Sequence, residues 1–441
     1  MGLKQLLGPI VDPVRGRLWR LHPRRVAALA RWSLGVVRTI RRRRRDPRLT
    51  VAVDVSPLWE PLTGIGWYLY RLLEHLAPRS DLVLRLYGPT LAADEAVGPP
   101  AVPLPEGPAL EPVLYPVPED AAIHPDRLIR LLRRLDRWLV AADGNRVLFA
   151  PNYLPSGRFD AATGALVATV HDLAYRVVPW AVRRETREWL ETELDRVWLR
   201  AARIVTVSRA VAGEITARGL ADPSRLRVIP NGPGASRGGG APQEPDPRQG
   251  TLPDSPEGFV LSVGTLEPRK NLETLLEAWS RLHRRRGDAP PLVLAGKLGW
   301  SADTLRRRVE EAAHAGWLLH LGYVDEATLA ALYRRTRLFV FPSHYEGFGL
   351  PVLEAMAAGV PVVASDLPVL REVAGDAVLY APPLDPEAWT LRIEGLLDDP
   401  ERTRRLAAAG RARAERFTWE RTAEAYTAVF REASGRAHRT S

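Results

Sequence analysis

The sequence predicts an α/β protein built from two doubly wound, Rossmann-like domains that face a central cleft. Three observations predict this fold class. Two series of short apolar strands alternate with amphipathic helices, a Gly- and Pro-rich stretch at 233–257 separates the two series, and glycine loops follow several strands. Such alternation is typical of a parallel sheet covered by helices on both faces. Ligands of these sheets bind at the carboxyl ends of the strands.

Composition and charge limit the classes of function. The 441 residues, 46% hydrophobic and 26% charged, suit two or three globular domains. The net charge of +10 is concentrated in residues 1–48, which contain 14 Lys or Arg and 2 Asp and so leave −2 for the rest. A nearly neutral body argues against a nucleic-acid partner. The absence of cysteine excludes disulfides and thiolate metal sites, and a cytoplasmic location is expected.

The basic segment 1–48 is expected to be an amphipathic N-terminal extension. A helix should follow Pro23, with apolar residues on one side and arginines on the other, and end in the run 41–45. This pattern is typical of a helix on an anionic membrane surface, which would make the protein peripheral at the inner face of the cell membrane. A solvated tail or a helix docked on the body is the alternative.

The first domain is expected over 49–233. Its first strand spans 50–55, and the sequence Thr63-Gly64-Ile65-Gly66 then opens a helix that runs to about Leu76. Further strands are predicted at 147–150, 166–170, 204–207 and 227–229, and a long helix at 183–202.

A Gly/Pro-rich linker or loop at 234–256 leads to a second domain at 257–415. Its strands are predicted at 259–263, 292–295, 318–321, 338–341, 360–364 and 377–380, and its helices at 272–284, 302–313, 326–335 and 351–358. The closing segment 416–441 contains a strong helix at 418–433, which is expected to cross back and brace the first domain.

The segment 346–354 carries two carboxylates around a glycine loop. Glu346 and Glu354 are eight positions apart, and the segment follows the apolar run 338–342. Pro351 is tolerated at the start of a helix, where its missing N–H has no partner. The free backbone N–H groups there, with the helix dipole behind them, favour an anion. One acid is expected at the pocket mouth and the other in the first helical turn.

A basic pair follows another strand end. Gly264 begins the segment 264–271, in which Arg269 and Lys270 are adjacent and Asn271 is placed to cap the next helix. Two cations at a strand end can neutralise a diphosphate and stabilise its charge as it leaves. A basic pair on the protein surface is the alternative.

The first domain contributes weaker motifs. His171 follows the strand 166–170, where a neutral imidazole can donate a hydrogen bond to a substrate hydroxyl. A structural histidine is the alternative. Gly64 and Gly66 permit close approach of the backbone to a ligand, and Asn231 with Gly232 forms either a simple turn or the rim of a pocket.

Taken in order along the chain, these motifs resemble the retaining glycosyltransferases of the GT-B fold, family 4, and within them the mannosyl- and rhamnosyltransferases of surface polysaccharide assembly. The resemblance covers about residues 50–433. It implies transfer of a sugar from a nucleotide-diphosphate donor, such as GDP-mannose or a GDP-deoxysugar, to a glycan or lipid-linked glycan acceptor. Retention of configuration is implied, with no metal and no other cofactor.

The resemblance also implies roles for individual residues. Arg269 and Lys270 would hold the donor diphosphate, Glu346 the donor sugar and Glu354 the ribose, and His171 would lie near the transferred carbon. The expected catalytic set is His171, Arg269, Lys270 and Glu346, and the expected donor-binding set is Gly64, Gly66, Asn231, Gly264, Gly347, Phe348, Gly349, Leu350 and Glu354, with no metal ligands.

Two alternatives stay open at this point. One is a sugar-nucleotide epimerase of the same architecture, and the other is a non-catalytic protein that binds nucleotide sugars. A nicotinamide-dependent enzyme is disfavoured because neither glycine segment forms a complete dinucleotide fingerprint with an acidic residue about 20 positions later.

Overall fold

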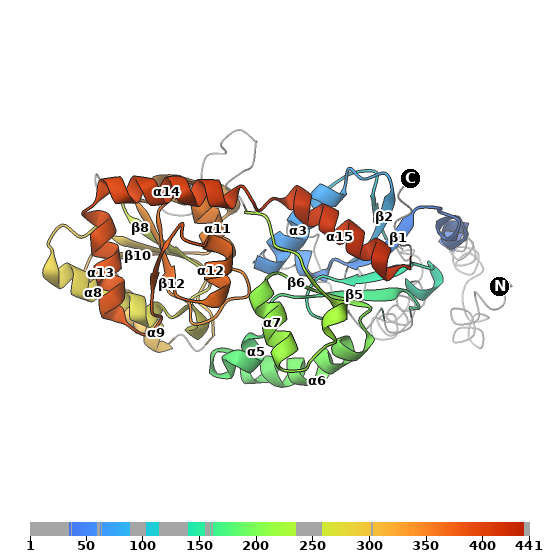
Figure 1. The fold of residues 1–441 in the computed structure, drawn as a ribbon, viewed down its shortest axis with the longest axis horizontal. Helices are drawn as coiled ribbons and strands as arrows, with labels where there is room; N and C mark the ends of the chain where they lie inside the picture. The colour runs from blue at the N-terminus through green and yellow to red at the C-terminus, as the bar shows by residue number, and fades with distance from the viewer. Residues whose placement is uncertain are drawn as a thin grey trace, which may run out of the picture.

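The computed structural model describes residues 35–36, 38–59, 62, 64–88, 103–113, 140–154, 159, 162–234, 258–300 and 303–435. Within these ranges the chain forms two parallel sheets, each with its own helices, that lie side by side along the long axis of the molecule (Figure 1). The sheet formed within residues 49–228 and its helices are called the first half, and the sheet formed within residues 260–381 and its helices are called the second half. The fold class predicted from the sequence is confirmed.

The first sheet has the strand order β3-β2-β1-β4-β5-β6-β7, with the reversal of order between β1 and β4. Its apolar residues point alternately into a core shared with α3 and a core shared with α5, α6 and α7. The sequence pattern did not indicate β2, β3 or α7. The strands are β1 (Leu49–Asp54), β2 (Leu82–Tyr87), β3 (Leu110–Pro112), β4 (Val147–Ala150), β5 (Ala165–Val170), β6 (Arg203–Thr206) and β7 (Leu226–Val228), and the helices are α3 (Gly64–Leu76), α5 (Ala174–Val177), α6 (Arg184–Arg200) and α7 (Arg209–Ala217).

The second sheet has the order β10-β9-β8-β11-β12-β13, with the reversal between β8 and β11. The strands are β8 (Val260–Val263), β9 (Leu292–Ala295), β10 (Leu318–Gly322), β11 (Leu338–Phe341), β12 (Val362–Ser365) and β13 (Leu379–Ala381), and the helices are α8 (Leu272–Arg285), α9 (Asp303–His314), α10 (Glu326–Arg335), α11 (Leu350–Ala357), α12 (Pro368–Ala374), α13 (Pro386–Leu397) and α14 (Pro400–Ala414).

Burial on both faces explains why the strands of the second sheet are continuous apolar runs. In β11, Leu338 and Val340 pack into the core beneath α8, α9 and α13, whereas Phe339 and Phe341 pack into the core beneath α10, α11, α12 and α14. All four side chains are buried. A central strand of a parallel sheet requires this pattern because helices cover both of its faces.

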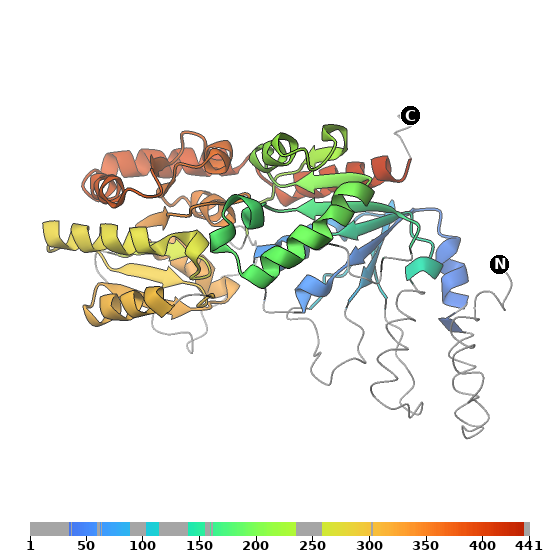
Figure 2. The ribbon, with the colours of Figure 1, turned by 90° about the horizontal axis from the view of Figure 1, so that it is seen from below.

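The final helix, α15 (Trp419–Ala433), crosses back to the first half as predicted. Figures 1 and 2 show α14 lying on the second half and α15 continuing along the first. Trp419, Tyr426 and Phe430 of α15 join the core that contains α3. The hydroxyls of Tyr68 and Tyr426 are 2.5 Å apart, and that of Tyr426 lies 2.9 Å from Thr169 Oγ1, so the buried polar atoms of this interface satisfy one another.

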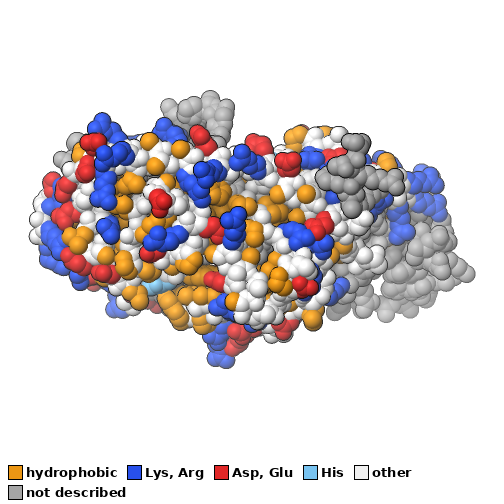
Figure 3. Space-filling model, in the orientation of Figure 1, with side chains coloured by type: hydrophobic (Ala, Val, Ile, Leu, Met, Phe, Trp, Pro, Cys, Tyr) orange, Lys and Arg blue, Asp and Glu red, His pale blue; other side chains and the backbone are white. Residues whose placement is uncertain are grey.

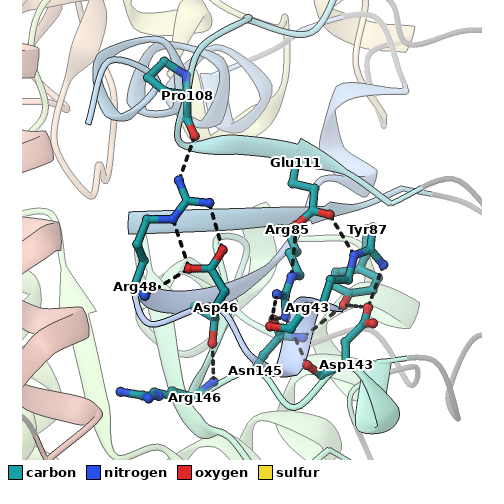
Figure 4. A network of polar contacts seen from close by, with 11 residues as sticks. Arg43, Asp46, Arg48, Arg85, Tyr87, Pro108, Glu111, Asp143, Asn145 and Arg146 are labelled. Atoms are coloured by element: carbon teal, nitrogen blue, oxygen red, sulfur yellow. Dashed lines mark hydrogen bonds and ion pairs between the residues drawn. The ribbon is translucent and has the colours of Figure 1, made fainter. Parts of the chain in front are cut away.

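The last part of the N-terminal extension is helical and docked on the first half. Residues 38–44 are helical, and Val36 and Ile40 are buried against the body. Arg43 donates to Glu111 at 2.8 Å and to Asp143 at 3.1 Å, inside a buried network that includes Arg85 (Figure 4). For these residues the docked alternative is correct, because their apolar side faces protein. The rest of the proposed helix, residues 24–34 and 37, lies outside the described residues.

In the described part of the chain, no helix combines the length and the apolar character needed to cross a membrane.

Candidate active site

The loops after β8 and β11 bring the two predicted motifs of the second half together. These strands are neighbours at the reversal of strand order, which is the place where ligands of such sheets bind. The first loop carries Arg269 and Lys270 in a short 3₁₀ turn, and the second carries Glu346. Lys270 Nζ lies 2.6 Å from Glu346 Oε1, and Arg269 Nη1 lies 3.1 Å from Glu346 Oε2. Residues 76 positions apart thus form one cluster.

This cluster is balanced in charge. Arg269 also pairs with Glu267 at 2.9 Å and donates to the Tyr345 carbonyl at 3.2 Å, so two cations face two carboxylates. Burial acts to raise the pKa of Glu346, but Lys270 and Arg269 outweigh it and hold the pKa at about 2. Burial lowers the pKa of Lys270, and the charge of Glu346 opposes that shift. Among the described residues, Arg269 uses four of its five N–H groups in these contacts and Lys270 uses one of three, so Lys270 has more donors left for an incoming anion.

Lys270 also lines a small cavity. Its side chain crosses Gly264, where a Cβ would lie 3.2 Å from Lys270 Cε. Gly264 has a φ of +149°, a value that favours glycine. The ammonium lies 4.9 Å from the centre of the Phe341 ring and lines a cavity of about 10 Å³ with Gly264 and Ser343, which is space for about one water molecule. Gly264 therefore gives the lysine side chain the room to reach this cavity.

Asn271 does not cap α8 as predicted. It precedes the helix in a left-handed conformation, with a φ of 52°, and its side chain accepts no hydrogen bond from a backbone N–H of the first helical turn. Instead, Nδ2 donates to the carbonyl oxygens of Pro342 at 2.9 Å and Pro383 at 2.6 Å, while Oδ1 accepts from Thr274 at 2.8 Å. The side chain therefore ties the basic turn to the loop after β11, which fixes the spacing of the charged cluster.

Glu354 lies on α11, in a different environment from Glu346. The helix begins at Leu350, so Glu354 is its fifth residue and belongs to the second turn, not the first. Tyr333 donates to its Oε2 at 2.9 Å, and the backbone N–H of Gly234, on the segment that leaves the first half, also donates to it. Burial raises its pKa to about 7, against the effect of Tyr333. Gly349, at the N-cap with a φ of 92°, provides no side-chain cap and leaves the helix start open.

His171 is held by its own half of the molecule. Its Nε2 lies 2.7 Å from the Pro151 carbonyl oxygen, and its ring meets those of Tyr68 and Tyr153 edge to face. A carbonyl can only accept, so Nε2 carries the hydrogen, and burial lowers the pKa of the ring. In the neutral form Nδ1 is therefore an acceptor. This geometry does not support the predicted donation from a neutral imidazole to a substrate hydroxyl.

The other predicted residues of the first half have packing roles of their own. A Cβ on Gly66 would lie 2.8 Å from Leu62, so this glycine allows α3 to pack, whereas Gly64 has open space around its Cα. Asn231 is buried, and its Oδ1 has no hydrogen-bond partner among the described residues. A ligand contact from any of these residues stays a prediction.

The two halves meet at Gly347. A Cβ on this glycine would overlap the carbonyl oxygen of His171, and the Gly347 carbonyl accepts from Ser208 Oγ at 2.8 Å. The loop that carries Glu346 is therefore seated directly on the first half. Phe348, predicted with this loop, is buried with α11 in the core of the second half.

Several residues at this junction were not identified from the sequence. Ser208 is one of them, although Ser before a helix is an ordinary cap signal and Ser208 does cap α7. Tyr345 sits beside a predicted acid, and Glu214 and Glu372 look like surface residues of amphipathic helices. No local pattern marks them, because their partners belong to the other half of the chain.

The described part of the chain contains no group of three or more His, Cys, Asp or Glu side chains that could hold a metal ion.

Two parallel sheets with an acid and cation cluster at their junction are the features expected of the GT-B class of glycosyltransferase. The model named Glycosyltransferase Family 4 matches residues 62–233, and the model named Glycosyl transferases group 1 matches residues 243–413. The O-antigen chain mannosyltransferase B of Escherichia coli is 32% identical over 387 residues, which cover 84% of this chain and 97% of that protein.

Solved structures show the same fold. Sucrose-phosphate synthase from Thermosynechococcus elongatus matches with a TM-score of 0.67 at 22% identity, over 88% of this chain and all of the other. Anabaena Alr3699/HepE, solved with UDP-glucose, matches with a TM-score of 0.62 at 16% identity, over 87% of this chain and 99% of the other. The chain belongs to glycosyltransferase family 4 and is a glycosyltransferase.

Proposed function

We propose that this protein transfers mannose, or a related deoxysugar, from a nucleotide-diphosphate donor to a glycan hydroxyl during polysaccharide assembly, with retention of anomeric configuration. The observation that carries the proposal is the cluster in which Lys270 and Arg269 hold the buried, ionised Glu346 at the junction of the two halves. The choice of sugar is supported by the printed function of the Escherichia coli relative, which matches over nearly its whole length. The UDP-glucose of HepE carries less weight at 16% identity.

Breaking the anomeric bond produces an oxocarbenium-like sugar and a charged diphosphate. In the proposed reaction Lys270 and the open start of α11 stabilise the diphosphate, and Arg269 keeps Glu346 in place. Glu346, with a pKa of about 2, remains an acceptor for sugar hydroxyls at any working pH. Glu354 receives the ribose hydroxyls. The charge of the leaving group is thus met by this chain's own residues, and no metal ion is invoked.

The first experiment screens the purified protein against nucleotide sugars, including GDP-mannose and UDP-glucose, by thermal stabilisation. The donor that stabilises it is then incubated with and without glycan acceptors, and nucleotide release and the anomeric configuration of the product are followed. We expect release that depends on the acceptor, and an α-linked product from an α-linked donor. Epimerised donor in the absence of acceptor, or binding without turnover, would contradict the proposal.

Lys270→Ala tests the role of the cation. Turnover at saturating donor should fall about 10²- to 10³-fold, the usual cost of losing one preorganised charge donor. Glu346 keeps Arg269 as a partner, so the fold should persist, which circular dichroism checks. Arg405→Ala is the control, because within the described ranges Arg405 pairs only with Glu401, on the exposed face of α14. A folded Lys270→Ala enzyme with wild-type turnover would reject the assignment.

We further propose that the N-terminal extension places the enzyme on an anionic membrane, where a lipid-linked acceptor would be met. The arginines at 38, 41, 42, 44 and 45 are exposed on a helix that the Arg43 network fixes to the body, and Figure 3 shows basic side chains at this end of the molecule. Each basic residue near such a surface contributes about 1 kcal/mol.

Vesicle binding tests this second proposal. Deletion of residues 1–34 removes seven Lys or Arg but keeps the docked helix. Binding to phosphatidylglycerol vesicles should weaken at least about tenfold, and binding to phosphatidylcholine vesicles should be weak for both proteins. Equal binding of both proteins to the anionic vesicles would count against a membrane role for residues 1–34.

A further inference from the structure

Tyr345 belongs to the second half by sequence but is buried in the first. It lies in the loop between β11 and α11, immediately before Glu346, and its side chain is 7% exposed. The ring packs in a small apolar cluster with Ala174, Val178 and Ala181, from α5 and the turn that follows it. The loop that carries the site therefore inserts one aromatic side chain into the opposite half.

The hydroxyl of Tyr345 makes two hydrogen bonds, both to the first half. It accepts from the backbone N–H of Leu173 at 2.9 Å and donates to Glu214 Oε2 on α7 at 2.8 Å. Leu173 is two positions after His171. Burial raises the pKa of the Tyr345 phenol, which keeps the proton on the oxygen that donates to Glu214. The hydroxyl thus contacts the N-cap residue of α5 and a side chain of α7 at the same time.

The main chain of the same segment is attached to the charged cluster. The Tyr345 carbonyl accepts from Arg269 Nη1 at 3.2 Å, and the N–H of His344 donates to the Arg269 carbonyl at 2.9 Å. The next residue, Glu346, holds both cations. A movement of Tyr345 out of the first half would therefore shift the backbone that positions Arg269 and Glu346.

A second contact also holds the second half against α7 of the first half. Glu372 of α12 accepts from the backbone N–H groups of Arg209 at 2.8 Å and Ala210 at 3.0 Å, at the amino terminus of α7. Together with the bond from Ser208 to Gly347, these contacts attach α7 to the second half at both the site loop and α12.

We propose that Tyr345 is a positioning residue that couples closure of the two halves to the alignment of Glu346 and Arg269. Its ring and hydroxyl enter the first half only when the halves are closed, and the closed seating sets the geometry that transfer requires. The donor itself binds to the second half whether or not Tyr345 is seated. This inference rests on the proposed glycosyl transfer.

Tyr345→Phe keeps the ring and removes only the hydroxyl. We expect kcat to fall about tenfold while donor affinity changes less than about twofold, because the variant loses closure and not the donor contacts. Tyr380→Phe is the matched control: its hydroxyl also donates a hydrogen bond, but to the backbone carbonyls of Gly375 at 2.6 Å and Leu370 at 3.2 Å, both within the second half. Its kcat should equal that of the wild type.

A double-mutant cycle assigns the effect to the pair of Tyr345 and Glu214. Glu214→Gln keeps an acceptor oxygen and should retain most of the activity, whereas Glu214→Ala should repeat the loss of Tyr345→Phe. The double variant Tyr345→Phe/Glu214→Ala should be no worse than either single variant, since both remove the same contact. Independent, additive losses would overturn the inference, as would wild-type kcat in Tyr345→Phe.

Small-angle scattering separates this inference from the proposed function, because it needs no turnover. The radius of gyration of the wild type should fall on adding the donor that stabilises it, and that of Tyr345→Phe should fall less. Equal compaction of both proteins, or equal losses of kcat and donor affinity in the variant, would reject the positioning role. A wild type that compacts but transfers no sugar would reject the proposed function and leave the coupling supported.

Discussion

Glu346 and Glu354 show how two buried carboxylates of one loop and helix acquire opposite properties. Glu346 lies between Lys270 and Arg269, which hold its pKa at about 2. Among the described residues, no cation is in direct contact with Glu354, and burial raises its pKa to about 7 despite the hydrogen bond from Tyr333. At neutral pH the first is a fixed negative charge, whereas the second changes its charge with small changes in pH.

The raised pKa of Glu354 predicts a pH-dependent donor affinity. Ribose hydroxyls are better accepted by a carboxylate than by a carboxylic acid, so affinity should be constant above about pH 7. It should fall as the pH drops through 7, approaching tenfold per pH unit for a contact made only by the ionised form. Calorimetric titration between pH 5.5 and 8 measures the donor affinity. The ligand is a nucleotide sugar, because its diphosphate diester does not titrate in this range.

Glu354→Gln is the control for this titration. Its amide cannot ionise, so affinity should be weak and flat across the range. A wild-type profile as flat as that of the variant would show that Glu354 does not bind the donor through its charge.

Arg269, Lys270 and Glu346 were predicted from the sequence because each sits in a motif that follows an apolar strand. Their contacts to one another were not predicted, and the structure places Glu346 2.6 Å from Lys270 and 3.1 Å from Arg269. Asn271 shows the limit of such reasoning. A cap was predicted from its place before α8. Instead, its side-chain amide donates hydrogen bonds to the carbonyls of Pro342 and Pro383, which lie within reach.

At the scale of elements, the loop between β11 and α11 is the part on which the site depends most. The φ value of Gly347 does not require glycine. A larger residue is excluded because the His171 carbonyl occupies the position that its Cβ would take. The glycine was expected to allow approach of a ligand. The structure adds that it allows approach of the other half of the protein.

Gly347→Ala should therefore abolish the closed arrangement. We expect activity to fall by more than about 100-fold, because a misplacement of about 1 Å at a site can cost that much, while the second half remains folded. Gly395→Ala in α13 is the matched control, since no atom lies within 4 Å of a Cβ there and alanine favours a helix. Steady-state assays and scattering with donor measure the outcome. Wild-type activity in Gly347→Ala would mean that the halves do not need this close seating.

At the scale of the whole molecule, α15 joins the two halves at the end of the chain. Trp419 is 6% exposed, and its Nε1 donates to the Pro233 carbonyl at 2.8 Å, on the segment that leads out of the first half. A Cβ on Gly232 would lie 2.6 Å from the Trp419 ring. The helix therefore braces the first half and the exit from it at the same place.

Trp419→Ala tests this brace. Removal of a buried tryptophan typically lowers the free energy of unfolding by about 3–5 kcal/mol. Trp189→Ala is the control, because Trp189 is 55% exposed on α6 and its loss should cost less than about 0.5 kcal/mol. Urea unfolding followed by circular dichroism measures both. Similar midpoints for the two variants would show that α15 contributes little to the stability of the first half.

The strands that the sequence predicted well are those with helices on both faces. β4, β9 and β11 begin and end where the apolar runs do, because burial on both sides leaves no polar residue within them. β2 was not indicated, since Arg85 interrupts its apolar run. That arginine is buried and bonded to Asn145 and to the backbone of Asp143, partners about 60 residues away that no local pattern reveals.

The sequence by itself determined the fold class, the order of most strands and helices, and the motifs that carry the chemistry, because periodicity and strand-end loops are local properties. Only the tertiary structure decided that Glu354 is partly protonated at neutral pH, that His171 donates to the Pro151 carbonyl, and that Tyr345 is buried in the opposite half. These properties depend on burial and on partners distant in sequence. Both arise only when the chain is folded, and the burial of Tyr345 arises only when the two halves are placed against each other.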